Sequence, residues 1–226
     1  MSLIEYKDLE QGTDEWLKAR LGLVTASVIG KLITAKTLKP ANNDEARGLT
    51  AQLVAERVLG WSDPSFFNQD MQRGHDIEPI ARDWYSQREG VEVAELGFMV
   101  RDDWGFSIGY SPDGLVGEDG LIEVKAPRAK THMLTHLSGE MPAYHMPQVQ
   151  TGLLVSGRKF CDFISFYAGM PPFVKRIHRD PQWHDAIIAA VEQFERNADL
   201  MLLDYAAATT DIPTTERLLI DMEMSF

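Results

Sequence analysis

The sequence lacks the features of an extracellular or membrane-bound protein. Cys161 is the single cysteine in 226 residues, which excludes an intramolecular disulfide and is typical of a reducing compartment. No apolar run approaches the length of a membrane span, and residues 1–8 are too charged for a signal peptide. There is no internal repeat and no low-complexity tract. We therefore expect a cytoplasmic protein without a membrane partner.

Basic residues are also scarce. The chain has 22 Lys and Arg against 34 Asp and Glu, a net charge of −12, which argues against a protein that coats nucleic acid non-specifically. The charge is uneven, because residues 120–179 contain eight Lys or Arg and three acids, whereas residues 199–226 contain six acids and one Arg. Such a chain would bind a polyanion only along a local basic track. Random fluctuation on a mixed surface explains the counts equally well.

Length and composition predict one globular domain over residues 1–226, because 44% of the residues are hydrophobic and 25% are charged. The order of elements predicts an α/β (α+β) fold with a central mixed β-sheet flanked by helices. Two strands around the turn at 102–105 predict a hairpin. Helices are expected over 14–21, 24–33, 48–59, 143–155, from about 77 and after 180; strands are expected over 91–100, 106–110, 121–126, 159–167 and 173–178.

The most informative motif is Ser-Pro-Asp-Gly at 111–114 followed by Glu-Val-Lys at 123–125. Side chains alternate along a strand, so Glu123 and Lys125 share one face of the predicted strand 121–126 while Val124 faces the core. An Asp from a neighbouring strand, Asp113, would complete a site for a hard divalent cation. Each half has a simpler explanation, since Glu-x-Lys is common on solvated strands and Pro, Asp and Gly form turns.

A third carboxylate, Glu78, lies in a predicted helix that begins near Ile77, with Pro79 in its first turn. Glu78 borders an apolar stripe that includes Ile80, so it would point toward the seam between helix and sheet. A first-turn Glu that favours the helix dipole is the alternative. A carboxylate that also faces two other acids is better explained as a metal ligand, because unpaired like charges would repel.

A second group of residues suits a phosphate. Thr25 and Ser27 are predicted at the start of a helix, where hydroxyls and free backbone N–H groups converge, and Arg20 would add a bidentate guanidinium. The alternative is a plain N-cap at Thr25 with Arg20 on the surface. The residues alone favour this alternative.

Taken in order, these motifs resemble the phage-lambda exonuclease family, the viral-type alkaline exonucleases and recombinases with a restriction-endonuclease-like core. The resemblance extends from about Gln11 to about Tyr167. It rests on Trp16, Arg20-Leu21-Gly22, Thr25-Ala26-Ser27, Gly74, Glu78, Ser111-Pro112-Asp113-Gly114, Glu123-Val124-Lys125 and Pro147-Gln148-Val149-Gln150.

The resemblance implies a role for each matching residue. Glu78, Asp113, Glu123 and the Val124 carbonyl would bind two Mg²⁺, which Mn²⁺ can replace. Lys125 would orient or deprotonate the attacking water, and Gln148 would support the Lys and the site. The 5′-phosphate would be held by Arg20, Thr25, Ser27 and Ser111. The family has an Arg several residues after Glu-x-Lys; here Arg128 and Lys130 are the nearest cations, and neither matches cleanly.

The resemblance also implies an activity. It predicts a Mg-dependent 5′→3′ exonuclease on double-stranded DNA ends, of phage or prophage origin, which releases 5′-mononucleotides and leaves a 3′ single strand for an annealing protein. It implies a homotrimer around the DNA. The apolar tail in residues 206–226 is expected at the subunit interface, with packing on its own domain as the alternative.

Two other classes of protein stay open. A sequence- or structure-specific endonuclease could use the same metal core, but it has no need of a 5′-phosphate pocket. A non-catalytic scaffold that binds DNA ends could keep the fold, but it has no need of acids clustered beside DNA.

Overall fold

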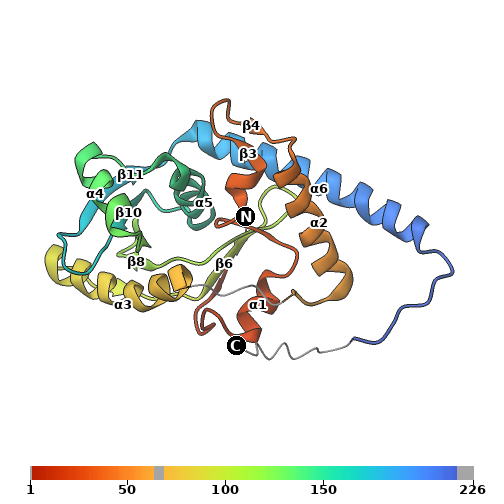
Figure 1. Ribbon diagram of the computed structural model, residues 1–226, viewed down its shortest axis with the longest axis horizontal. Helices are drawn as coiled ribbons and strands as arrows, with labels where there is room; N and C mark the ends of the chain where they lie inside the picture. The colour runs from red at the N-terminus through yellow and green to blue at the C-terminus, as the bar shows by residue number, and fades with distance from the viewer. Residues whose placement is uncertain (1, 64–68, 218–226) are drawn as a thin grey trace.

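The computed structural model describes residues 2–63 and 69–217 (Figure 1). The predicted loop 62–68 therefore lies mostly outside the described residues. In chain order the elements are β1 (Leu3–Tyr6), α1 (Asp14–Arg20), β2 (Val24–Thr25), the 3₁₀-helix η1 (Ile29–Leu32), β3 (Ile33–Thr34), β4 (Lys39–Pro40), α2 (Asp44–Leu59), α3 (Gln69–Glu89), β5 (Val93–Ala94), β6 (Phe98–Arg101), β7 (Ile108–Tyr110), β8 (Gly114–Val116), β9 (Gly120–Lys125), α4 (Ala129–Ser138), the 3₁₀-helix η2 (Ala143–His145), α5 (Met146–Ser156), β10 (Phe160–Ser165), β11 (Phe173–His178) and α6 (Pro181–Ala208).

The strands form two mixed sheets and a small hairpin. The first sheet has the order β11-β10-β9-β8-β5 and the second β1-β6-β7-β2, while β3 pairs with β4. The pairs β9–β10 and β2–β7 are parallel, and the predicted hairpin is the antiparallel pair β6–β7. The predicted α/β class, with helices around mixed β-sheets, is confirmed. The single strand predicted over 91–100 is wrong, because β5 and β6 belong to different sheets.

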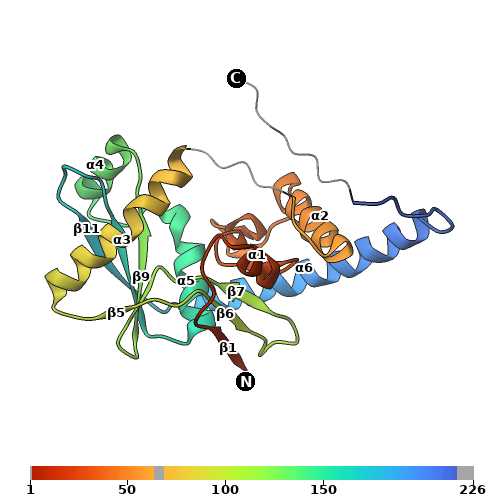
Figure 2. The same cartoon turned by 90° about the horizontal axis from the view of Figure 1, so that it is seen from below.

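Helices cover both faces of the five-stranded sheet (Figures 1 and 2). On one face, Ala81 and Tyr85 of α3 pack with Ile122 and Val124 of β9. On the other face, the larger core joins β9 and β10 to α5 and α6. Helix α5 also packs on β6 and β7, so it bridges the two sheets. This position makes α5 the support of the region where the sheets meet.

Helix α3 starts at Gln69, eight residues before the predicted start, and Pro79 lies inside it. Pro79 and His75 are both exposed, so water can hydrate the His75 carbonyl that Pro79 leaves without its helical donor. Glu78 is thus in the third turn, which removes the helix-dipole explanation. The stripe is also narrower than predicted, because Ile80 is 52% exposed.

The helix predicted from residue 24 does not form. Val24 and Thr25 pair with β7 in parallel, opposite Ile108 and Gly109, and the Ala26 N–H donates to the Gly109 carbonyl at 2.9 Å. β-branched residues favour this pairing, and only η1 follows it. Thr25 is therefore not a helix cap. Strand β8 and helix α4 were not predicted, and Val58, expected inside, is exposed.

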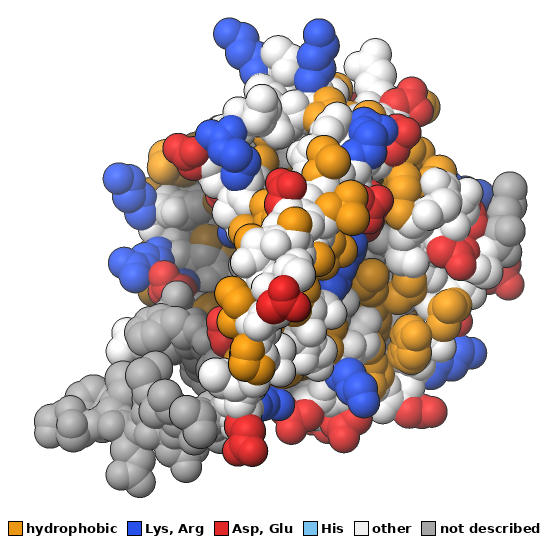
Figure 3. Space-filling model, turned by 90° about the vertical axis from the view of Figure 1, so that its right-hand side faces the viewer, with side chains coloured by type: hydrophobic (Ala, Val, Ile, Leu, Met, Phe, Trp, Pro, Cys, Tyr) orange, Lys and Arg blue, Asp and Glu red, His pale blue; other side chains and the backbone are white. Residues whose placement is uncertain are grey.

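Helix α6 begins as predicted, with the Asp180 side chain accepting a hydrogen bond from the Gln182 N–H. Its buried side chains lie between His184 and Ala198, whereas its C-terminal part projects past α2 (Figures 1 and 2) and exposes Leu200, Leu203 and Tyr205. Figure 3 views the molecule from this side and shows hydrophobic side chains among charged ones. The apolar tail residues 218–226 lie outside the described residues. In residues 2–63 and 69–217 no helix is long and apolar enough to cross a membrane.

Candidate active site

Strand β9 lies at the centre of its sheet, between β8 and β10, and both of its faces are covered. Glu123 is fully buried, so the structure excludes the explanation that Glu-x-Lys is a solvated face. One Glu123 oxygen, Oε1, accepts hydrogen bonds from Lys125 Nζ at 2.6 Å and from Gln148 Nε2 at 2.5 Å. Gln148, in the first turn of α5, thus supports the carboxylate that pairs with Lys125.

Asp113 follows β7 and reaches β9 through its side chain. Its Oδ2 accepts a hydrogen bond from the Val124 N–H at 2.7 Å. Arg82 connects Glu78 to the loop that carries Asp113, because it donates to Glu78 Oε1 at 2.8 Å and to the Asp113 carbonyl at 3.0 Å. It also pairs with Glu95. Sequence reasoning missed Arg82, although its i,i+4 spacing from Glu78 was a signal.

Two of the carboxyl groups, Asp113 and Glu78, have raised pKa values. Burial raises the pKa of Asp113, and the neighbouring Glu123 adds to the rise. Burial likewise raises the pKa of Glu78, and Arg82 only partly offsets it. Burial would lower the pKa of Lys125, but Glu123 and Asp113 outweigh this and raise it. The site therefore combines an excess of negative charge with a lysine held in its ammonium form.

This donor set fits a hard divalent cation. The three acids do not form a ready-made metal cluster, and the described residues contain no other group of three His, Cys, Asp or Glu that does. However, two buried oxygens, Glu123 Oε2 and Tyr110 Oη, have no hydrogen-bond partner in the described part of the chain. A buried carboxylate oxygen without a partner is costly, and oxygen donors of this kind suit Mg²⁺ or Mn²⁺. The predicted ligand set stays a prediction.

A cavity of about 530 Å³ opens beside these acids. Glu78, Asp113 and Lys125 line it, together with Arg128 from the start of α4. Arg128 pairs with Asp70 at 3.2 Å, whereas Lys130 lies on the exposed surface of α4. Arg128 and Lys130 are the two cations nearest to the position where the family has an Arg. Of these two, the structure places Arg128 at the cavity.

Several cations of the basic segment 120–179 are paired with acids. Much of its positive charge is neutralised locally. Three of its cations form ion pairs: Lys159 with Asp119 at 2.7 Å, Lys175 with Glu140 at 2.8 Å and Arg176 with Asp162 at 2.7 Å.

The predicted phosphate residues do come together, around a second cavity of about 210 Å³. Arg20 Nη1 donates to Ser111 Oγ at 3.2 Å, and Nη2 donates to Thr25 Oγ1 and Ser27 Oγ at 3.4 Å each. The guanidinium stacks on the Trp16 ring at 3.9 Å. Trp16 Nε1 also donates to Ser111 Oγ at 3.0 Å, a role that sequence reasoning missed. The convergence comes from sheet pairing and not from a helix N-terminus.

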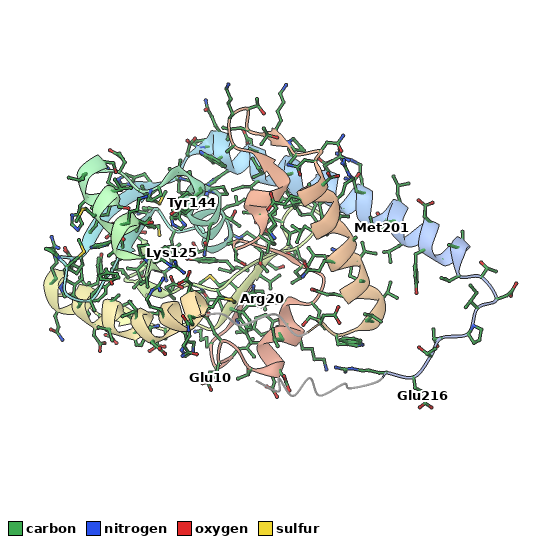
Figure 4. The ribbon with its side chains drawn as sticks, in the orientation of Figure 1. Glu10, Arg20, Lys125, Tyr144, Met201 and Glu216 are labelled. Atoms are coloured by element: carbon green, nitrogen blue, oxygen red, sulfur yellow. The ribbon has the colours of Figure 1, made fainter. Side chains whose placement is uncertain are left out.

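The chemistry of this pocket suits an anion. Burial lowers the pKa of Arg20 to about 10, so the side chain stays charged at neutral pH. Its three hydrogen-bond acceptors are neutral hydroxyls, which a phosphate can displace. Asp113 and Gln148 also line this cavity, so it adjoins the acidic site. Figure 4 labels Arg20 and Lys125, which line the two cavities that share Asp113.

Comparison with known proteins gives one family match. Residues 15–159 match the model of the YqaJ-like viral recombinase domain. An uncharacterized protein of Acanthamoeba polyphaga mimivirus is 30% identical over 183 residues, which cover 74% of this chain. The aligned region covers 31% of the mimivirus protein, so the chain spans about a third of that relative's length.

Comparison with solved structures agrees with the family match. The chain is similar to LHK-Exo, an alkaline exonuclease from Laribacter hongkongensis. The complex of LHK-Exo with dAMP is 33% identical, covers 89% of this chain and 100% of the other, and has a TM-score of 0.79. A phage related exonuclease from Haemophilus somnus has a TM-score of 0.66 at 15% identity, over 81% of this chain and 96% of the other, which shows the shared fold. The resemblance drawn from the motifs is confirmed, and the chain belongs to the YqaJ-like viral recombinase family.

Proposed function

We propose that this chain is a metal-dependent exodeoxyribonuclease that degrades one strand of double-stranded DNA from its 5′ end. It would release 5′-mononucleotides and leave a 3′ single strand. The main support is that Asp113 lines both the acidic cavity and the Arg20 pocket. An anion pocket beside a hydrolytic site suits a terminal 5′-phosphate, which an enzyme that cuts within a duplex does not need.

In this proposal Glu78, Asp113, Glu123 and the Val124 carbonyl hold two Mg²⁺ ions, or Mn²⁺. Bound metals of this kind lower the pKa of water and neutralise charge that develops on a phosphate. Lys125 stays an ammonium group and donates to the attacking water or to a phosphate oxygen. Gln148 fixes the Glu123 carboxylate through its 2.5 Å hydrogen bond, so that the second oxygen, Oε2, remains free to bind.

The family and its neighbours support a nuclease. LHK-Exo is named an alkaline exonuclease and was crystallised with dAMP, a nucleoside monophosphate. A monophosphate is the product expected here. The Arg20 pocket, with three hydroxyls around one guanidinium, has the donors that such a phosphate requires.

We further propose a single nuclease domain that acts in the cytoplasm of a phage-infected or prophage-carrying cell, as a homotrimer, with a single-strand annealing protein as partner. Leu200, Leu203 and Tyr205 on the projecting part of α6 are 50–67% exposed, and apolar groups exposed in this way often mark an interface. Identical subunits in a closed ring would make heterologous contacts.

Digestion of linear duplexes tests the activity. The substrate carries a label at one 5′ end or at one 3′ end, and reactions contain Mg²⁺ or EDTA. We expect early release of the 5′ label as a mononucleotide in Mg²⁺, and none in EDTA. Lys125→Ala serves as the inactive control. Release of the 3′ label first would contradict the direction, and cutting of closed-circular DNA would favour the endonuclease alternative.

A further inference from the structure

An exposed aromatic ring stands at the rim of the acidic cavity. Tyr144, in η2, is 66% exposed, and it lines the same cavity as Asp113 and Lys125. Figure 4 shows Tyr144 and Lys125 close together, with Arg20 farther along the same region. The distal edge of the cavity therefore has an aromatic surface, whereas its floor is charged.

The Tyr144 ring packs against the His145 ring, which packs in turn against Phe163. The centroids of Tyr144 and His145 are 4.3 Å apart, and those of His145 and Phe163 are 5.2 Å apart. Phe163 belongs to β10 and is 1% exposed, so this column of rings stands on the core. The same segment continues into α5, whose Gln148 contacts Glu123. A short stretch of chain thus connects Tyr144 to Gln148 and the acidic site.

The other aromatic rings around the two cavities are less exposed than Tyr144. Among the described residues that line them, Trp16 is covered by the Arg20 guanidinium at 3.9 Å. Tyr110 is 1% exposed, and His145 lies beneath Tyr144. Tyr144 is therefore the ring in this part of the structure that an incoming planar group can cover.

We propose that Tyr144 is a nucleobase-stacking residue, which binds the base of a nucleotide next to the scissile phosphate. This inference rests on the proposed function, because it assumes that the substrate is a nucleic acid. Every base has a π-face, so stacking would hold the strand without selecting a sequence. The acidic site and the Arg20 pocket recognise only phosphate chemistry, and Tyr144 would supply the contact to the base.

A double-mutant cycle, which combines substitution of Tyr144 with removal of a base from the substrate, tests this proposal. Wild type, Tyr144→Phe and Tyr144→Ala are each assayed on 5′-phosphorylated duplexes that have an intact base or a tetrahydrofuran abasic residue at the first or the second nucleotide. Equilibrium binding in Ca²⁺ is measured by fluorescence anisotropy, and kcat/KM in Mg²⁺. We expect Tyr144→Ala to weaken binding of the intact duplex roughly five- to hundredfold, the range of a base–aromatic stack. Tyr144→Phe should retain it.

The abasic substrate gives the decisive comparison. If Tyr144 stacks on a base, then Tyr144→Ala has no further effect once that base is absent at one of the two positions. Leu137→Ala, which removes a 77% exposed side chain of α4, is the matched control and should behave as wild type on all duplexes. An equal loss on intact and abasic duplexes, or no loss, would overturn the inference while leaving exonuclease activity intact. Binding without cleavage would instead refute the proposed function, and the binding cycle would still decide on Tyr144.

Discussion

Selection of a 5′-phosphate by Arg20 can be predicted in magnitude from its contacts. The guanidinium hydrogen bonds to Ser111, Thr25 and Ser27 are 3.2–3.4 Å long, at the weak end of the normal range. A terminal phosphate would replace these contacts with a charge-assisted bidentate contact, which contributes about 1.5–3 kcal/mol in total. Wild type should therefore prefer a 5′-phosphate over a 5′-hydroxyl by roughly ten- to hundredfold in kcat/KM.

Three variants test separately the charge of Arg20, the planar geometry of its guanidinium and its support by Trp16. Arg20→Met keeps an unbranched stem on Trp16 but removes the charge, so the preference should fall close to one. Arg20→Lys keeps a point charge without the planar fork and should be intermediate. Trp16→Phe keeps the stack and loses the hydrogen bond to Ser111, a neutral bond that contributes about 0.5–1.5 kcal/mol, so the preference should fall about two- to tenfold.

The assay mixes the 5′-phosphate duplex and the 5′-hydroxyl duplex, which carry labels of different colour, in one reaction. The ratio of the two rates then cancels any difference in the fraction of folded enzyme. Circular dichroism before each assay shows whether a variant is folded. Equal rates on both ends in wild type, or an unchanged ratio in Arg20→Met, would refute the assignment of this pocket to a 5′-phosphate.

Three further predictions concern the acids, pH and assembly. Asp113→Asn should abolish cleavage, yet raise the melting midpoint in EDTA at pH 8 by about 2–4 °C per kcal/mol of relieved repulsion. The amide oxygen can still accept the hydrogen bond from the Val124 N–H, so this contact is kept. A lower midpoint would contradict the prediction. Burial, helped by Lys125, lowers the pKa of His145 to about 3, so the folded state excludes a proton that the unfolded state binds below about pH 6.5. Stability should thus fall as pH decreases from 6.5 to 5, by up to about 2 kcal/mol from this group, and urea titrations of His145→Gln should show a shallower fall than wild type. Light scattering should give a mass near three chains, and excess competitor DNA added after digestion begins should barely slow it; a monomeric mass or immediate arrest would exclude the ring.

Much of the chemistry could be read from local sequence. Alternation along one strand placed Glu123 beside Lys125, and the structure pairs them at 2.6 Å. Strand 173–178 was predicted with its observed bounds, and Asp180 caps α6 as expected. These features depend on residues a few positions apart, whose side-chain spacing fixes their direction.

Other features depend on partners far along the chain, and local patterns missed them. Val24 and Thr25 form a strand because β7, more than eighty residues away, offers a free edge. The contacts of Trp16 and Arg20 with Ser111 span 95 and 91 positions. No local period encodes such pairs, because they arise only when two elements dock.

The types of group in the site follow from the sequence alone, since carboxylates, a lysine, an arginine and hydroxyls are present in a recognisable order. Their burial and their contacts depend on the tertiary structure. The tertiary structure buries both faces of β9 and gives Glu123 Oε2 no hydrogen-bond partner among residues 2–63 and 69–217. It also links Glu78 to the Asp113 loop through Arg82 and exposes Tyr144 at the rim. Burial and exposure are properties of the packed chain, because they depend on which surfaces other elements cover.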